Sequence, residues 1–184
     1  MIFLVNGPPR SGKTTALYHL STTRPNCATY RMARPIDRAV PELLQVNSAA
    51  WKSIEDGYKD DGVIFGKTPR ELKIALSVFL KSMFGPAIFG EIAMIAFRSL
   101  IFQDIIVDIG HTTEAEVIVR KMREIGQSKC VCLQLERDGC TFKDDSREYI
   151  DCNKLGIPVR KIHNRHELEM FYEQLNIAVE ELSK

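Results

Sequence analysis

The stretch Gly7-Pro8-Pro9-Arg10-Ser11-Gly12-Lys13-Thr14-Thr15 decides the fold of this 184-residue chain. It follows the pattern G-x-x-x-x-G-K-T, a loop whose backbone N–H groups point inward around a phosphate. In this pattern the lysine brings an ammonium group to the β- and γ-phosphates, and the threonine hydroxyl is a ligand for Mg²⁺. We therefore expect nucleotide phosphates to be bound by Gly7, Arg10, Ser11, Gly12, Lys13, Thr14 and Thr15, with Thr14 also at the metal.

The residues on either side of this loop agree with the motif. Ile2-Phe3-Leu4-Val5 is wholly apolar, as is typical of a strand buried on both faces. Ala16, Leu17 and Leu20 then fall at helical spacing. The order is strand, loop, helix, so a helix N-terminus adds its partial positive charge at the loop. This context disfavours a chance match in an ordinary glycine-rich turn.

Composition narrows the class of protein. Apolar residues make up 45% and charged residues 27%, with a formal net charge of +1, so no global basic field points to nucleic acid as a partner. The longest apolar stretch, Pro86 to Phe97, contains Glu91 and is too short to cross a bilayer. The first strand begins at residue 2, leaving no room for a signal peptide. We expect a cytoplasmic protein without a membrane partner, in the host cytoplasm if a phage encodes it.

The cysteines give a second indication of compartment. There are five of them, Cys27, Cys130, Cys132, Cys140 and Cys152. An odd number without a secretory signal predicts free thiols in a reducing compartment. Cys130 and Cys132 with Cys140 could form a metal site, but the spacing is not that of a zinc knuckle and no histidine pair completes it. We favour buried structural cysteines.

Five short apolar runs, separated by helical patterns, predict the architecture. They cover residues 2–5, 27–31, 104–108, 130–135 and 157–162. Strands alternating with helices imply a three-layer α/β domain with a five-stranded parallel sheet, the P-loop NTPase fold, over residues 1–184. Ligands bind at the carboxyl ends of such strands. This edge should gather the loop at 7–15, the residues after Arg31, Asp108, and the segment 136–147.

The segment between the second and third strands is too long for a simple crossover. Residues 35–100 are mostly helical in pattern, and we expect them to form a helical cap that binds the second substrate. Thr68-Pro69-Arg70-Glu71 is a strong helix start, with a capping box between Thr68 and Glu71. One apolar face should follow it, made by Leu72, Ala75, Leu76, Phe79 and Met83. Residues 47–66 show little periodicity and are expected to be irregular.

Four charged residues outside the loop are candidates for chemistry. Asp108 ends a buried strand, where it could hold the Mg²⁺ shell or position the acceptor, or serve as a turn residue. Arg137 and Arg147 flank the charged segment 136–147, which is either a lid that excludes water or a solvated loop. Arg70 lies in the first turn of a helix, where a cation is locally unfavourable, so it is either a ligand for a bound anion or a solvent-facing arginine.

These segments resemble the phage and bacterial deoxynucleoside monophosphate kinase family. Besides the loop at 7–15, Arg31-Met32-Ala33-Arg34-Pro35-Ile36 is similar to a family F-A-D-P-L stretch. Gly66-Lys67-Thr68-Pro69-Arg70-Glu71-Leu72 is similar to G-x-T-P-R-E-L. Asp108-Ile109-Gly110-His111-Thr112-Thr113-Glu114-Ala115-Glu116 is similar to D-V-R-F-P-N-E-A-E.

The resemblance implies ATP with Mg²⁺ as the phosphoryl donor and a nucleoside 5′-monophosphate as the acceptor. For such a reaction the candidates for catalysis are Lys13, Asp108, Arg137 and Arg147, with either Arg137 or Arg147 closing over the transition state. The candidates for the acceptor site are Arg34, Lys67, Arg70 and Asp108. The sequence departs from the family at two positions: Arg34 replaces an aspartate and Gly110 replaces an arginine. Arg34 could supply the charge that Gly110 lacks.

Three functions stay open at this point. The first is a nucleotide kinase, in which the acceptor phosphate is already ionised and needs no base. The second is a small-metabolite kinase acting on an alcohol, which would need a base such as Asp108. The third is a P-loop protein that binds nucleotide as a regulatory module. The sequence also leaves a homodimer open.

Overall fold

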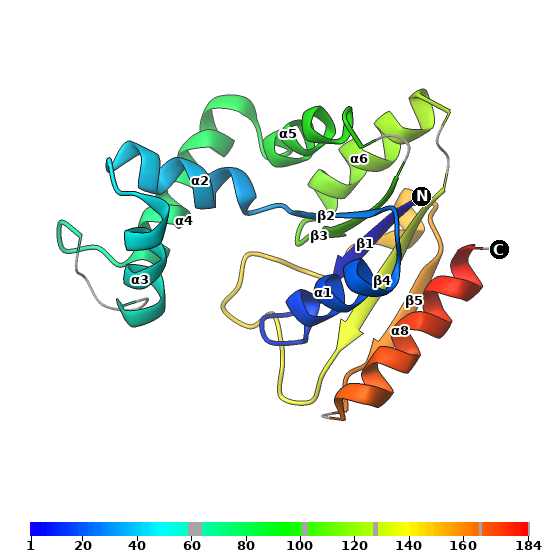
Figure 1. Cartoon of the computed structure of the whole chain (residues 1–184). Coiled ribbons are helices and arrows are strands. Elements are labelled where there is room, and N and C mark those ends of the chain that lie inside the picture. Colours follow the sequence, from blue (N-terminus) through cyan, green and yellow to red (C-terminus); the bar gives the residue numbers. More distant parts are fainter. Residues whose placement is uncertain (59–63, 101–102, 127–128, 166, 184) are drawn as a thin grey trace. The chain divides into compact units, whose positions relative to one another are not determined.

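The computed structural model describes residues 1–58, 64–100, 103–126, 129–165 and 167–183. The chain forms two compact units (Figure 1). The first comprises Met1–Met32 and Phe89–Lys184, and the second comprises Ala33–Ile88. Each unit has its own set of internal contacts.

The first unit contains a parallel sheet of five strands in the order β2-β3-β1-β4-β5. The strands are β1 (Ile2–Asn6), β2 (Cys27–Arg31), β3 (Asp104–Asp108), β4 (Cys130–Glu136) and β5 (Val159–His163). The predicted five-stranded parallel sheet is confirmed, with strand ends displaced by one or two residues. Because β1 lies in the middle, the loop that follows it opens at the centre of the carboxyl edge.

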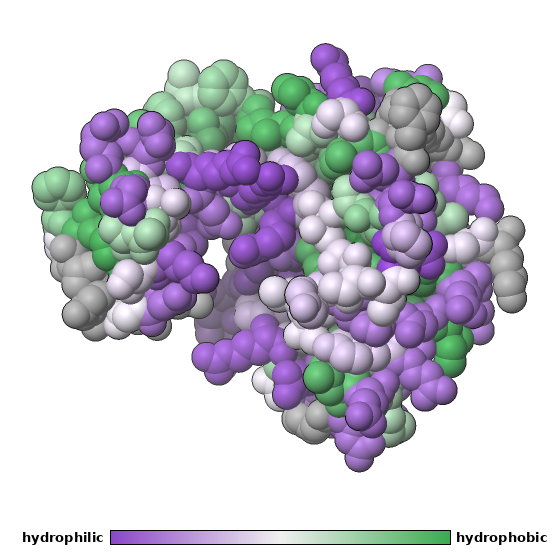
Figure 2. All heavy atoms as spheres, viewed as in Figure 1, coloured by the Kyte–Doolittle hydropathy of each residue, from purple (hydrophilic) through white to green (hydrophobic). Residues whose placement is uncertain are grey.

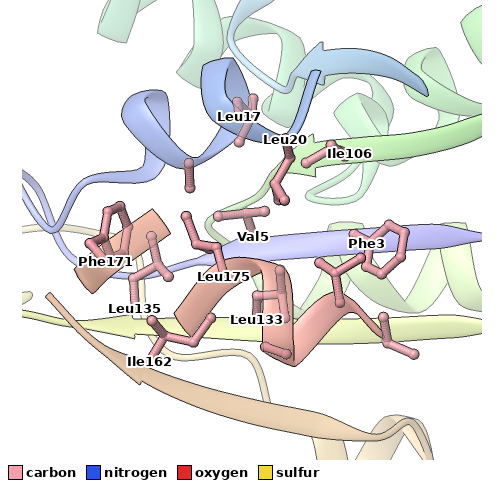
Figure 3. Close-up of a cluster of buried hydrophobic side chains, with 14 residues drawn as sticks. Phe3, Val5, Leu17, Leu20, Ile106, Leu133, Leu135, Ile162, Phe171 and Leu175 are labelled. Carbon is pink, nitrogen blue, oxygen red and sulfur yellow. The ribbon is translucent and has the colours of Figure 1, made fainter. Parts of the chain in front are cut away.

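One face of the sheet packs against α1 (Lys13–Thr23) and α8 (Leu168–Ser183). Figure 3 shows the side chains of this core meeting between the sheet and the two helices. Phe3 and Val5 point to this face because side chains alternate along a strand. They meet Leu17 and Leu20 of α1 and Leu175 of α8. This packing fixes the direction in which α1 leaves the phosphate-binding loop.

The opposite face is covered by α5 (Ile88–Phe97) and α6 (Thr112–Glu124), which completes three layers (Figure 1). Phe97 of α5 meets Tyr30 of β2 edge to face, with ring centroids 5.2 Å apart. Ile118 of α6 is fully buried. A short helix, α7 (Cys152–Leu155), precedes β5.

The second unit holds three helices: α2 (Arg34–Leu43), α3 (Ser48–Tyr58) and α4 (Pro69–Phe84). Lys73 of α4 ties them together, because its ammonium donates to Asp37 of α2 at 3.1 Å and also to Glu55 of α3. Trp51 of α3 is buried, in agreement with a packing role.

One expectation for the second unit was wrong. Residues 48–58 form α3 rather than an irregular segment, because the Asn47 side chain caps the helix by accepting from the Ala50 amide at 2.9 Å. Residues 59–63 of the same expectation lie outside the described residues. On the apolar face of α4, Phe79 and Met83 are exposed.

The expected cap over residues 35–100 does not coincide with the compact second unit. The second unit ends at Ile88. From Phe89 onward, α5 belongs to the first unit, where Phe97 contacts Tyr30 of the sheet. Its apolar residues Phe89, Ala93 and Phe97 are buried, which is why this helix groups with the sheet. Of the chain between β2 and β3, residues 33–88 form the second unit, which we call the insertion.

The surface in Figure 2 is mostly hydrophilic or intermediate, with hydrophobic residues between polar ones. In the part of the chain that the structure describes, no single helix is long and apolar enough to cross a membrane; α4 and α5 would meet that criterion only as a bent pair, by length and composition.

Candidate active site

The loop at 7–15 lies between β1 and α1, in the position that the motif predicts. Gly12 is the N-cap of α1 with φ 104°, a left-handed conformation that favours glycine, and no side chain caps the helix. A Cβ at Gly12 would lie 2.6 Å from Nδ2 of Asn164, and one at Gly7 would lie 2.7 Å from the Leu135 carbonyl oxygen. Both glycines are therefore required by the close packing of the loop.

The Lys13 side chain is folded against its own loop. Its ammonium donates to the carbonyl oxygens of Gly7 at 2.7 Å and Pro8 at 2.8 Å. The residue is only 8% exposed, and burial lowers the pKa of Lys13 while nearby Asp108 opposes that change. Thr14, in contrast, is exposed in the first turn of α1, where its hydroxyl is free to meet a ligand.

Two further loop residues have defined surroundings. Arg10 is exposed and adopts φ 64°, and its carbonyl oxygen accepts from Nη1 of Arg137 at 3.3 Å. Ser11 is completely buried, and its hydroxyl has no hydrogen-bond partner among the described residues. The carbonyl oxygen of Ser11 accepts from Asn164 at 3.0 Å. Arg137 and Asn164 thus hold the loop from the ends of β4 and β5.

Asp108 ends β3 at the same edge of the sheet. In register it pairs with Val5 of β1 and with Arg31 of β2. Burial raises the pKa of Asp108, and the positive charges of Lys13, Arg31 and Arg147 act against that rise. The carboxylate therefore lies within electrostatic reach of three cationic side chains.

Arg147 completes this group. Its Nε donates to Oδ1 of Asp145 at 2.8 Å and its Nη2 to Oδ2 at 2.5 Å, a bidentate ion pair. That hydrogen bond to Asp145 raises the pKa of Arg147. The charge of Arg147 also acts on both Lys13 and Asp108, which places the guanidinium in the same cluster.

The structure thus brings together the loop at 7–15, Asp108, Arg137 and Arg147. Among the other predicted site residues, Arg34, Lys67 and Arg70 belong to the second unit, where all three are exposed. Arg34 opens α2, and Arg70 lies in the first turn of α4 after a capping box formed by Thr68 and Glu71. That capping box is confirmed.

The strand order, the loop after the central strand and the three layers make this a P-loop NTPase fold. No protein-family model and no curated protein sequence matches the chain.

Several solved structures resemble it along almost their whole length. Thymidylate kinase from Ehrlichia chaffeensis matches with a TM-score of 0.49 and 15% identity, over 97% of this chain and 98% of that one. A sugar kinase from Janibacter sp. HTCC2649 matches with a TM-score of 0.43 and 14% identity, over 97% and 94%. Dephospho-CoA kinase from Campylobacter jejuni matches with a TM-score of 0.43 and 12% identity, over 98% and 96%. At these levels of similarity the neighbours do not identify a substrate.

Sequence reasoning missed three residues of the site. Asp145 orients Arg147, Asn164 holds Ser11, and Asn6 is a fully buried side chain at the end of β1. The signal for Asn6 was present, since a polar residue closes an otherwise apolar strand. Asp145 and Asn164 had no such signal, because their partners are set by the path of the loops.

The cysteines do not form a metal site in the described residues, where no group of three or more His, Cys, Asp or Glu side chains is placed to hold an ion. Cys130, Cys132 and Cys152 are buried, while Cys27 and Cys140 are partly exposed. The expectation of buried cysteines is therefore confirmed for Cys130 and Cys132 and wrong for Cys140. All five thiols are free.

Proposed function

We propose that this protein is an ATP-dependent kinase that transfers the γ-phosphoryl group to a nucleoside 5′-monophosphate. The observation that carries the proposal is the arrangement of Lys13, Asp108 and Arg147 around an uncapped helix N-terminus at the carboxyl edge of the sheet. Phosphoryl transfer depends on positioning and on positive charge around the transferred group, and this edge supplies both.

The donor phosphates bind at the loop and at the first turn of α1. The backbone N–H groups there and the Lys13 ammonium face the negative charge. The donor set fits Mg²⁺, since the Thr14 hydroxyl and the Asp108 carboxylate are hard oxygen ligands of the kind this ion prefers. Bound Mg²⁺ would neutralise charge on the phosphates. On binding, the ammonium of Lys13 exchanges the carbonyl oxygens of Gly7 and Pro8 for phosphate oxygens.

The acceptor phosphate binds in the second unit. Arg70 follows the cap residue of α4, so its guanidinium and the helix N–H groups can share one anion. Arg34 at the start of α2 and Lys67 beside the cap add positive charge. A dianionic monophosphate matches this set of cations better than a neutral alcohol does. No base is needed, because a phosphate oxygen is ionised at neutral pH.

A second candidate is a kinase for an alcohol group. The observation that favours it is Asp108, because burial raises the pKa of this carboxyl and brings it closer to that of a general base. In this reaction Asp108 would accept the hydroxyl proton as the alcohol oxygen attacks the γ-phosphorus.

A coupled assay of ADP release separates the two functions. It should be run with Mg·ATP against a panel of ribo- and deoxynucleoside monophosphates and a panel of sugars and other polyols, with Lys13→Ala as the inactive control. We expect ADP release with at least one monophosphate. Release only with alcohols would support the second candidate, and no release above the control with either panel would refute a kinase function.

A further inference from the structure

Gly110 follows β3 directly after Ile109 and is buried. A Cβ placed on Gly110 would lie 2.5 Å from Cδ and 2.7 Å from Cγ of Arg147. Its φ lies outside the left-handed region, so the backbone conformation does not demand glycine. The space that a side chain at position 110 would need is filled by the methylene stem of Arg147.

The chain around Arg147 is fastened to the same place. The Glu148 amide donates to the Gly110 carbonyl oxygen at 3.2 Å. Asn6 donates to the carbonyl oxygens of Ile109 at 3.0 Å and Glu148 at 3.1 Å, and it accepts from the Ile150 amide at 3.0 Å. One buried amide side chain therefore links the ends of β1 and β3 to the segment that carries Arg147.

The guanidinium is held as well as the stem. Asp145, whose side chain is only 11% exposed, accepts from the Arg147 backbone amide at 2.9 Å and from two of its side-chain nitrogens. Asp145 thus fixes both the backbone and the head group of Arg147, while Gly110 leaves room for its stem. An arginine so restrained has lost most of its side-chain freedom before a ligand arrives, which favours tight and well-oriented anion binding.

We propose that Gly110 is a seat for Arg147: glycine at position 110, with Asn6 and Asp145 as positioning residues, fixes the Arg147 guanidinium beside Lys13 and Asp108 as a preformed ligand for the γ-phosphate of ATP. This rests on the proposed use of the loop for ATP. The positive charge that position 110 lacks then comes from Arg147, which lies in the same unit, and not from Arg34.

A double-mutant cycle tests whether glycine at position 110 positions Arg147 for binding ATP. Gly110→Ala places a methyl group where the stem lies, and we expect the affinity for Mg·ATP to fall about tenfold to a hundredfold, as for loss of a charge-assisted contact. ADP affinity should change less than twofold, roughly the scatter between independent sites. In an Arg147→Ala background the added methyl has room, so Gly110→Ala should have no further effect. Isothermal titration calorimetry with ATP and with ADP measures all four proteins.

Gly57→Ala is the matched control, because a Cβ there meets nothing within 4 Å. If Gly110→Ala weakens ATP equally in both backgrounds, or leaves ATP affinity unchanged, the seat is refuted. If Gly110→Ala alone does not fold, the Arg147→Ala background supplies the folded comparison, and a double variant that is also unfolded contradicts the proposal. The measurement of ATP affinity needs no acceptor. If the two substitutions are coupled but no monophosphate is turned over, the proposed function is rejected and the role of Gly110 in positioning Arg147 still holds.

Discussion

At the scale of single residues, the Lys13 ammonium is the group on which the site depends. It is buried against the Gly7 and Pro8 carbonyl oxygens. The loop surrounds the end of the Lys13 side chain, and the exposed fraction of this side chain is therefore low. The ammonium thus helps to set the conformation of the loop at 7–15 through these two hydrogen bonds.

Lys13→Ala should lower kcat about a hundredfold to a thousandfold, as for loss of one preorganised charge-stabilising group. Thermal unfolding should change little, because the buried ammonium is itself costly, as its lowered pKa indicates. Lys154→Ala is the control: that side chain is 63% exposed and pairs with Glu116. Turnover of Lys13→Ala near that of the control would remove the loop from catalysis.

Asp108→Asn should raise the melting temperature at neutral pH while it lowers activity. Burial raises the pKa of Asp108 above its ordinary value, so the folded state holds this proton more tightly than the unfolded state does. Stability from this group is present at acid pH and declines as pH rises through the folded pKa. The gain from asparagine should therefore shrink as the pH falls toward about 4. Melting curves across this range, with exposed Asp138→Asn as control, would contradict the prediction if the gain were constant.

At the scale of elements, the start of α4 combines a capping box with the proposed binding of the acceptor phosphate. Thr68 accepts from the Glu71 amide at 3.0 Å, and Glu71 accepts from the Thr68 amide at 2.8 Å. Removing the hydroxyl with Thr68→Ala should cost about 1 kcal/mol of unfolding free energy in urea. Thr68→Ser keeps the acceptor oxygen and should cost much less. Equal losses in the two variants would show that the hydroxyl does not cap the helix.

Arg70→Ala should weaken the acceptor rather than ATP. Loss of a bidentate, charge-assisted contact is worth on the order of 1.5–3 kcal/mol, which is roughly tenfold or more in KM for the monophosphate. The KM for ATP should barely move. Steady-state kinetics with each substrate varied in turn decides this, and exposed Arg38→Ala on α2 is the control. A change confined to ATP would assign Arg70 to the donor.

At the scale of the whole molecule, substrate binding should protect two regions from hydrogen exchange. These are the insertion and α5, expected as the cap over 35–100, and the segment 136–147 expected as a lid. The Glu148 and Ile150 amides are already hydrogen-bonded and should exchange slowly in both states. Exchange measured with and without a bisubstrate analogue tests this. Unchanged protection in both regions would contradict the lid and cap.

The sequence predicts the part of the molecule that local pattern controls. From the motif at 7–15 and the apolar strands, we could predict the parallel sheet. We could also predict that Lys13 and Asp108 lie at its carboxyl edge. The seat at Gly110 could not be predicted, because residue 147 reaches it only through the path of a long loop. The same is true of Asn6, whose three partners lie more than a hundred residues away in sequence.

The difference in exposure among the free thiols allows one cysteine to be labelled selectively with a dye. Burial raises the pKa of Cys27 and of Cys130 to about 11, so little thiolate forms there at neutral pH, and Cys132 and Cys152 are inside the core. Cys140 is partly exposed within the segment 136–147. A maleimide dye will therefore attach first at Cys140, and its fluorescence can follow this segment in real time without any substitution.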